Sequence, residues 1–247
     1  MKQLVAFDLD GTLAPSKHVI DAEMAGLLAR LTMTITVAVM SGGDWPQFEA
    51  QLIGRLPAEC ELSQLFLLPT SGTKLYRYAG AWRQIYTEAL SIAERTTITE
   101  ALEAVITLLD LDGPPKWGSR IEDRGTQVTF SALGQQAPPD AKLAWDPDRS
   151  KRERIQATLS PLLPGFAVRI GGSTSIDITR QGIDKGYGIV RLSQASGISL
   201  GDMMFIGDAL YPGGNDHAVM KLGVDAIAVR DVEETKRIIE TVILCGK

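Results

Sequence analysis

Two carboxylates stand at the end of the first apolar run of the sequence. Asp8 and Asp10 close the segment that begins at Leu4, and Gly11 and Thr12 follow them directly. Residues two apart in a strand point the same way, so we expect both carboxylates to face one side. Carboxylates at the carboxyl end of a parallel strand lie where open α/β sheets bind ligands, and Gly11 lets the backbone turn sharply and expose N–H groups to an anion. A solvated acidic turn after a strand is the alternative that this motif leaves open.

Three later segments carry residues that could complete a site. Ser41–Asp44 follows the apolar run Thr34–Met40 and combines a serine hydroxyl with glycine N–H groups, which suit a phosphate oxygen. Lys185 precedes a helical pattern, and Gly207–Asp216 supplies two carboxylates and an amide oxygen, the ligands that Mg²⁺ prefers. Taken singly, the first segment is also an ordinary capped helix start, and Lys185 an ordinary surface charge.

The elements around these motifs predict an α/β core. Short, nearly continuous apolar runs are typical of strands buried on both faces of a parallel sheet. They occupy Leu4–Leu9, Thr34–Met40, Met203–Ile206 and Ala226–Val229. Helical spacing in Asp21–Leu31 places a helix between the first two strands, as in a doubly wound parallel sheet. Sheets of this type bind ligands at the carboxyl ends of their strands, where the motifs fall.

The middle of the chain has a different texture. Short β-rich pieces accompany helical stretches at Thr99–Leu109 and Arg149–Leu162, which is the pattern of an α+β domain. Glycine-containing joints near Tyr78–Ala81 and Gln181–Gly188 flank this region. We therefore expect a core formed by residues 1–81 and 184–247, into which residues 82–183 are inserted as a second domain.

Composition narrows the class of partner. The 247 residues carry 25 Lys and Arg against 30 Asp and Glu, a formal net charge of −5. No basic excess is present to release counterions from a nucleic acid. Cys60 and Cys245 are too isolated for a disulfide framework, and the apolar runs are far shorter than the ~20 residues of a membrane-spanning helix. We expect a cytoplasmic protein with neither nucleic-acid nor membrane partners.

Together the four motifs resemble the signatures of the haloacid dehalogenase (HAD) superfamily of aspartate-dependent phosphotransferases. Within it, three segments are similar to the eukaryotic-type phosphomannomutases: Arg120–Gln135 (RIEDRGTQVTFSALGQ), Arg169–Gly182 (RIGGSTSIDITRQG) and the loop PGGNDH. The resemblance implies a doubly wound, Rossmann-like core. It also implies that the inserted domain is an α+β cap of the C2B type, which contributes substrate specificity.

The resemblance implies a role for each motif residue. Asp8 is the expected nucleophile and Asp10 the expected acid and base, while Lys185 neutralises the phosphate. The expected Mg²⁺ ligands are Asp8, the backbone carbonyl of Asp10, and Asp208. Asn215 and Asp216 are expected either to support the metal or to hold Lys185. The other expected phosphate-binding residues are Thr12, Ser41 and Gly42.

The inserted domain departs from the family pattern. Phosphomannomutases grip the distal phosphate of the substrate with several cap arginines. This chain keeps one as Arg124 but has Trp117 and Gln135 at two other positions, whereas Ser175 and Asp177 match cap positions that contact sugar hydroxyls. Charge-assisted contacts contribute ~1.5–3 kcal/mol each, so the two missing arginines would let a bisphosphate intermediate escape and favour hydrolysis.

The sequence therefore leaves three functions open. The leading hypothesis is a Mg²⁺-dependent phosphatase that hydrolyses a small phosphorylated substrate, a sugar phosphate, through an aspartyl phosphate. The alternative is a phosphomannomutase-like hexose-phosphate mutase. A catalytically silent ligand-binding protein is disfavoured because the acidic set is complete. A homodimer formed through the cap is compatible with the resemblance, while the identity of the substrate is beyond the sequence.

Overall fold

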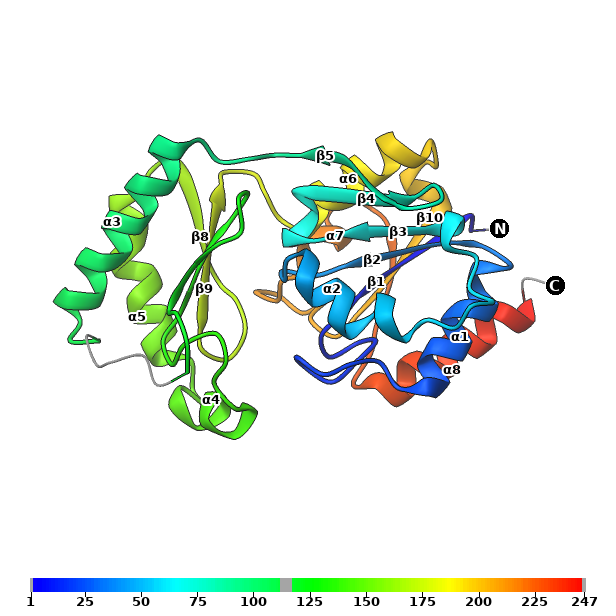
Figure 1. Cartoon of the computed structure of the whole chain (residues 1–247), viewed down its shortest axis with the longest axis horizontal. Helices are drawn as coiled ribbons and strands as arrows, with labels where there is room; N and C mark the ends of the chain where they lie inside the picture. Colours follow the sequence, from blue (N-terminus) through cyan, green and yellow to red (C-terminus); the bar gives the residue numbers. More distant parts are fainter. Residues whose placement is uncertain (1, 112–116, 246–247) are drawn as a thin grey trace. The chain divides into compact units, whose positions relative to one another are not determined.

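The computed structural model describes residues 2–111 and 117–245, which form two compact units (Figure 1). The larger unit comprises Met1–Thr87 and Asp184–Lys247 and is α/β; the smaller comprises Glu88–Ile183 and is α+β. The predicted fold class is confirmed. Among the described residues, no helix combines the length and the apolar character needed to cross a bilayer.

A seven-stranded sheet forms the centre of the larger unit, in the order β11-β10-β1-β2-β3-β4-β5. The first five strands in this order are parallel, and β4 and β5 are antiparallel additions at one edge. The strands are β1 Leu4–Asp8, β2 Thr36–Met40, β3 Leu65–Leu68, β4 Lys74–Tyr78, β5 Trp82–Thr87, β10 Met203–Gly207 and β11 Asp225–Ala228.

Helices cover both faces of this sheet, which is why its inner parallel strands β1, β2, β3 and β10 are continuous apolar runs. Alternate residues of β1 divide between two cores: Val5 and Phe7 pack with α1 and α8, and Leu4 and Ala6 pack with α6 and α7. Figure 1 shows the two helical layers. The helices are α1 Ala22–Thr32, α2 Trp45–Gln51, α6 Lys185–Ser196, α7 His217–Met220 and α8 Val232–Cys245, with short 3₁₀ turns at η1 Ile53–Arg55, η2 Leu62–Gln64, η3 Thr70–Gly72 and η5 Leu200–Asp202.

One boundary differs from the expectation. The segment Trp82–Thr87, assigned to the insert, is strand β5 and pairs with β4 in the large sheet. The joint at Tyr78–Ala81 is a hairpin turn, in which Ala79 N–H donates to the carbonyl of Ala81 and Gly80 takes a φ of 76°. The smaller unit therefore begins at Glu88 rather than at residue 82.

The smaller unit is a four-stranded antiparallel sheet, in the order β6-β7-β9-β8, with helices on one face (Figure 1). Val128, Phe130, Ile176 and Ile178 face α3 and α5 and form its core. The strands are β6 Ile121–Asp123, β7 Val128–Ser131, β8 Phe166–Ile170 and β9 Ser175–Arg180, and the helices are α3 Ile92–Leu108, α4 Pro139–Trp145, α5 Ser150–Leu159 and the 3₁₀ turn η4 Ser160–Leu162.

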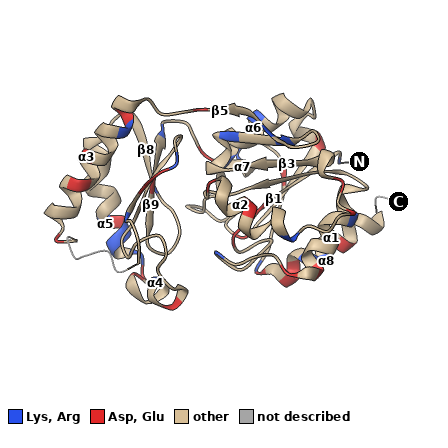
Figure 2. Cartoon of the chain, viewed as in Figure 1, with Lys and Arg blue, Asp and Glu red and all other residues tan. Residues whose placement is uncertain are grey.

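Acidic residues gather on α1 and α8 of the larger unit (Figure 2). Three of them surround Lys236, whose ammonium lies 2.7 Å from Asp21, 2.7 Å from Glu23 and 2.8 Å from Glu233. Because Lys236 is only 6% exposed, this arrangement fastens the last helix to the first and neutralises part of the acidic surface.

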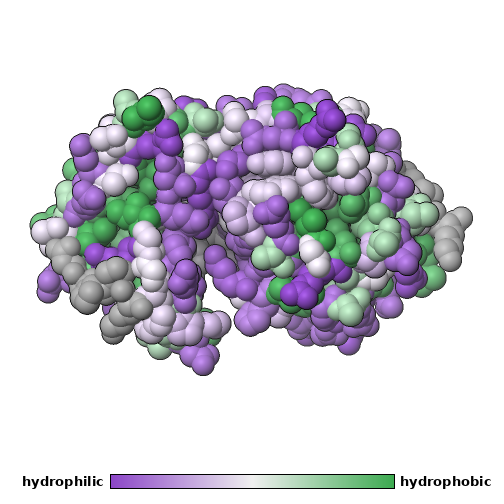
Figure 3. All heavy atoms as spheres, viewed as in Figure 1, coloured by the Kyte–Doolittle hydropathy of each residue, from purple (hydrophilic) through white to green (hydrophobic). Residues whose placement is uncertain are grey.

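Apolar side chains reach the surface of the smaller unit as well. Ile92 and Leu108 of α3, Leu143 of α4 and Leu162 of η4 are all more than half exposed. Figure 3 shows apolar surface where α3 lies in Figure 1. A homodimer formed through this unit stays a prediction.

Candidate active site

Asp8 lies at the centre of the site because β1 lies at the centre of the parallel strands. It is the last residue of β1, between β2 and β10, and its side chain is 5% exposed. The carboxyl ends of the parallel strands meet at this edge, where α/β sheets bind ligands.

Lys185 reaches Asp8 from the start of α6. Asp184 caps this helix by accepting the Tyr187 N–H, and the cap places Lys185 at its first residue. The Lys185 ammonium is buried and donates to Asp8 Oδ1 and Asp216 Oδ1, both at 2.5 Å. Asp216 also accepts the backbone N–H of Ala209 at 3.1 Å, so its carboxylate is held on both sides. Of the two roles predicted for Asp216, the structure shows the one that holds the lysine.

Close backbone packing brings α6 to this position. A Cβ built on Gly72, where φ is 85°, would lie 2.3 Å from the Cα of Gly188 in α6. The preceding turn contains Thr70 and Ser71, both with positive φ. Thr70 donates its backbone N–H to the carbonyl of Gly43, and Ser71 donates its own to that of Ser41. This strained turn therefore joins the loop after β2 to the helix that carries Lys185.

Asp208 completes a cluster of three aspartates. Carboxylate oxygens of Asp8, Asp208 and Asp216 all lie within 4.8 Å of one another. Thr12 accepts the N–H of Asp208 at 3.1 Å, and the Asp208 carboxylate packs so closely on Gly11 that a Cβ there would lie 2.6 Å from its Oδ2. The Thr12 hydroxyl thus contacts Asp208, and its phosphate-binding role stays a prediction.

Burial and the neighbouring charges shift the pKa values of Asp8, Asp208 and Lys185. Burial raises the pKa of Asp8 well above its ordinary value; Lys185 opposes this and Asp216 adds to it. Burial also raises the pKa of Asp208, again with the help of Asp216. Burial alone would lower the pKa of Lys185, but Asp216 and Asp8 reverse the effect and raise it. Three carboxylates thus share one ammonium, that of Lys185, and the acidic groups of the cluster outnumber the basic one.

The donor set fits a magnesium ion. Carboxylate oxygens are hard ligands, and an octahedral Mg²⁺ takes one or two of them together with water and substrate oxygens. Both oxygens of Asp216 accept hydrogen bonds, one from Lys185 and one from the Ala209 N–H, whereas Lys185 contacts one oxygen of Asp8. Asp8 and Asp208 are therefore the carboxylates best placed to hold such an ion. Asn215 is exposed in the loop before Asp216. The contribution of the Asp10 carbonyl stays a prediction.

Asp10 is oriented by hydrogen bonds, not by the strand. Because β1 ends at Asp8, strand alternation does not extend to Asp10, contrary to the expectation of a shared strand face. Its Oδ1 accepts the backbone N–H of Lys17 at 2.6 Å. Its Oδ2 accepts the side-chain amide of Gln47 at 2.7 Å, and the Ser41 hydroxyl lies 3.5 Å away. Nothing in the type or spacing of Gln47 marked it in the sequence.

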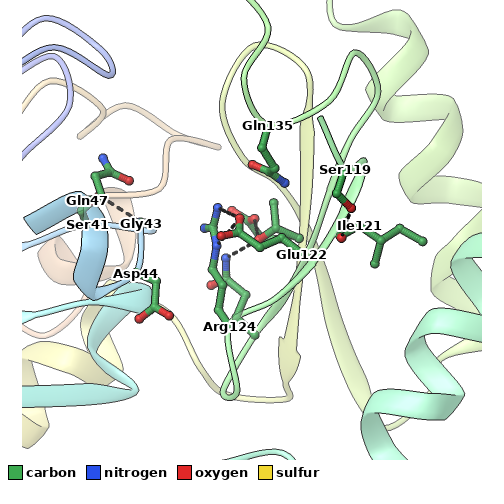
Figure 4. Close-up of polar contacts among 12 residues, drawn as sticks. Ser41, Gly43, Asp44, Gln47, Ser119, Ile121, Glu122, Arg124 and Gln135 are labelled. Carbon is green, nitrogen blue, oxygen red and sulfur yellow. Dashed lines mark hydrogen bonds and ion pairs between the residues drawn. The ribbon is translucent and has the colours of Figure 1, made fainter. Parts of the chain in front are cut away.

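The loop after β2 forms a compact N–H-rich turn. The Ser41 hydroxyl is buried and accepts the N–H of Gly43 at 3.1 Å, as Figure 4 shows. Gly42 lies between them, and Asp44 caps α2 and pairs with Lys74 at 2.6 Å. The loop therefore brings Ser41 beside Asp10, whereas the phosphate contacts of Ser41 and Gly42 stay predictions.

In the smaller unit, the candidate substrate residues lie on the sheet face opposite its helices. One row of facing residues crosses all four strands as Glu122, Thr129, Asp177 and Arg169. The Thr129 hydroxyl donates to Asp177 at 2.7 Å. Polar groups of this variety suit a polyhydroxylated ligand.

Ser175 and Arg124 lie beside this row of residues and extend the polar face. Ser175 and Asp177 flank Gly171, whose Cβ would lie within 2.8 Å of an oxygen of each. Arg124 is 8% exposed and donates from Nε and Nη2 to one oxygen of Glu122, at 2.9 and 2.6 Å (Figure 4). The one arginine that matches the family's cap pattern is therefore already paired within its own unit.

The sequence model of eukaryotic phosphomannomutase matches residues 24–245. The chain belongs to this family. Phosphomannomutase of Schizosaccharomyces pombe is 26% identical over 88% of this chain and 85% of that protein. Human phosphomannomutase 1 is 28% identical over 87% and 82%. Asp8 and Asp10 precede the matched range of the family model, so the match does not include them. Their place in the site comes from the position of Asp8 at the end of β1 and of Asp10 just beyond it.

The phosphomannomutase family and the fold place the chain in the HAD superfamily, as the four motifs predicted. A solved haloacid dehalogenase-like hydrolase from Bacteroides thetaiotaomicron superposes with a TM-score of 0.65. The match covers 98% of this chain and 100% of that chain at 16% identity, which shows a common fold.

Proposed function

We propose that this phosphomannomutase-family protein moves a phosphoryl group between hydroxyls of a hexose phosphate, with Asp8 as the carrier. The observation that carries the proposal is the position of Asp8, which is buried at the end of the central strand, 2.5 Å from the Lys185 ammonium and within the reach of Asp208. The family supports the mutase reaction over the phosphatase reaction that the sequence favoured.

In the first half-reaction a carboxylate oxygen of Asp8 forms a bond to phosphorus, and the bond from phosphorus to the sugar oxygen breaks. Asp10 gives its proton to the departing oxygen. Lys185 offsets part of the negative charge of Asp8 and keeps its hydrogen bond to Asp216. In the second half-reaction Asp10 takes a proton from the accepting hydroxyl, which then attacks the aspartyl phosphate.

Repulsion between the carboxylates and the phosphate must be offset. It amounts to roughly 4 kcal/mol per pair of unit charges at ~4 Å with an effective dielectric of ~20. When bound by Asp8 and Asp208, with the Asp10 carbonyl, Mg²⁺ would supply the compensating positive charge. Ser41, Gly42 and Thr12 are proposed to orient the phosphate oxygens. Arg124, Ser175 and Asp177 are proposed to contact the sugar, as part of a smaller unit that selects the substrate.

Hydrolysis is the second candidate, and a specific observation favours it. Trp117 and Gln135 stand where the family usually has phosphate-gripping arginines, and Arg124 is engaged with Glu122. A sugar phosphate that is held too weakly would leave before it accepts the phosphoryl group from Asp8, and water would then take that group and release inorganic phosphate.

Both candidates are tested with the same substrates. Hexose 1-phosphates are incubated with the protein and Mg²⁺, with and without catalytic hexose 1,6-bisphosphate, and followed by ³¹P NMR. A mutase yields hexose 6-phosphate and responds to the bisphosphate, whereas a phosphatase yields inorganic phosphate and does not. Asp8→Asn should abolish both reactions, while Asp225→Asn, on the exposed start of β11, should leave them intact. Normal turnover by Asp8→Asn would refute the proposal.

A further inference from the structure

The carboxylate of Asp10 needs an external support. Asp10 lies two residues beyond the end of β1, in a turn that places its side chain partly in solvent. A general acid must keep the oxygen that carries its proton within about 2.6–3.2 Å of the oxygen that receives it. A carboxylate free to rotate would miss that oxygen for part of the time.

Gln47 supplies that support from the first turn of α2. Its Nε2 donates one hydrogen to Asp10 Oδ2 at 2.7 Å and lies 2.7 Å from Gln51 Oε1, which accepts the other. Gln51 is one helical turn further on and is 5% exposed. A rotated amide would place the oxygen of Gln47 against two other oxygens, so only one orientation of this amide satisfies the network.

Gly43 provides the space that this arrangement needs. A Cβ built on Gly43 would lie 1.6 Å from Oε1 of Gln47 and 2.3 Å from its Cδ. Figure 4 shows Gly43 and Gln47 next to each other at the start of α2. On the other side of Asp10, the N–H that reaches Oδ1 belongs to Lys17, whose φ of 64° lies in the left-handed region. Both oxygens of Asp10 are therefore held.

We infer that Gln47 is a positioning residue for Asp10, which it holds in the orientation that delivers a proton to the leaving oxygen. This inference rests on the proposed function, in which the bond from phosphorus to an alkyl oxygen breaks and the Asp10 proton ends on that oxygen. A nitrophenolate, by contrast, departs as a stable anion and needs no proton. The role of Gln47 should therefore depend on the leaving group.

The experiment compares two phosphate esters in single turnovers with Mg²⁺. Gln47→Met removes the donor at nearly constant volume, and it should slow the release of an alkyl alcohol from a hexose phosphate by about tenfold or more. The release of nitrophenolate from p-nitrophenyl phosphate should change by less than about twofold. Gly43→Ala should reproduce this difference because it displaces Gln47 without altering it. Glu49→Met, an exposed site in the same helix, is the matched control and should change neither rate.

Equal slowing of both esters by Gln47→Met would overturn the inference, because a merely structural loss does not distinguish leaving groups. If the unmodified protein transfers no phosphoryl group from either ester, the proposed function fails instead. Crystal structures of the protein and of Gln47→Met then decide whether Gln47 positions Asp10. An Asp10 carboxylate that keeps its orientation without Gln47 would also overturn the inference.

Discussion

Removal of the Lys185 ammonium is the most direct test of the charge balance at the site. In Lys185→Met the carboxylates of Asp8 and Asp216 each lose a partner at 2.5 Å, and both are almost completely buried. The methionine fills most of the volume of the lysine stem, so the change acts mainly on charge. Two buried carboxylates are then left without their cation.

The loss of one partner from a buried ion pair costs about 3–5 kcal/mol. With a urea dependence of ~1–3 kcal/mol per M, a loss of 3 kcal/mol lowers the unfolding midpoint by roughly 1–3 M. Two changes should restore part of the loss. Asp216→Asn removes one of the unpaired charges, and Mg²⁺ supplies a new partner for Asp8 and Asp208.

The assay must report on the larger unit alone, because two units need not unfold together. Trp45 and Trp82 lie in the larger unit, and Trp117 and Trp145 lie in the smaller one. In a background that carries Trp117→Phe and Trp145→Phe, tryptophan fluorescence reports the urea unfolding of the larger unit alone at pH 8. Each variant is measured in EDTA and in Mg²⁺.

Two results would refute the reasoning. The first is an unfolding midpoint for Lys185→Met in EDTA equal to that of its parent. The second is a loss of stability that Asp216→Asn does not reduce, because it would mean that packing rather than charge carries the effect.

Two further predictions concern other parts of the chain. Gly11→Ala and Gly80→Ala both place a side chain at positive φ, at a cost of ~1–2 kcal/mol in stability. Only Gly11→Ala should also weaken the Mg²⁺ affinity measured by calorimetry, because its Cβ meets Asp208, whereas a Cβ on Gly80 meets nothing within 4 Å. Equal Mg²⁺ affinities of the two variants would contradict this prediction. The hydrogen bond from Arg180 lowers the pKa of Glu94 to about 2 from 4.5. This pair is partly exposed, so it stabilises the folded protein by less than ~1 kcal/mol. That contribution is complete above pH 4.5 and is lost as the pH falls toward 2. The difference in urea stability between the protein and Glu94→Gln should shrink over that interval, and a constant difference would show that another contact is responsible.

Most of the parallel core could be predicted from the sequence because its inner strands are buried on both faces, although β3 was missed. β1, β2 and β10 are buried apolar runs whose character does not depend on distant partners, whereas β11 is a short edge strand whose residues are exposed or half-exposed. Strand β5 has no such run, since its residues are exposed or half-exposed. Its place in the large sheet follows from the hairpin with β4, which is a tertiary fact that local composition does not contain.

The candidate site divides in the same way. Asp8, Lys185 and Asp208 could be found from their residue types at strand and helix ends, and the structure brings them together. Gln47 could not, because a glutamine in the first turn of a helix is common and only the folded chain places its amide on Asp10. The contact of Gly72 with Gly188 was equally hidden, since neither residue shows which backbone it will touch.

The interrupted course of the larger unit has a consequence for synthesis on the ribosome. Residues 88–183 form an uninterrupted unit that is complete before residue 184 is added. At that moment β1 has β2 on one side, but its other edge awaits β10, which begins at Met203. A nascent chain that stops there exposes an apolar edge strand, a template for pairing with other chains. The last quarter of the protein therefore closes the sheet as well as supplying Lys185 and Asp208, and products truncated before it should aggregate.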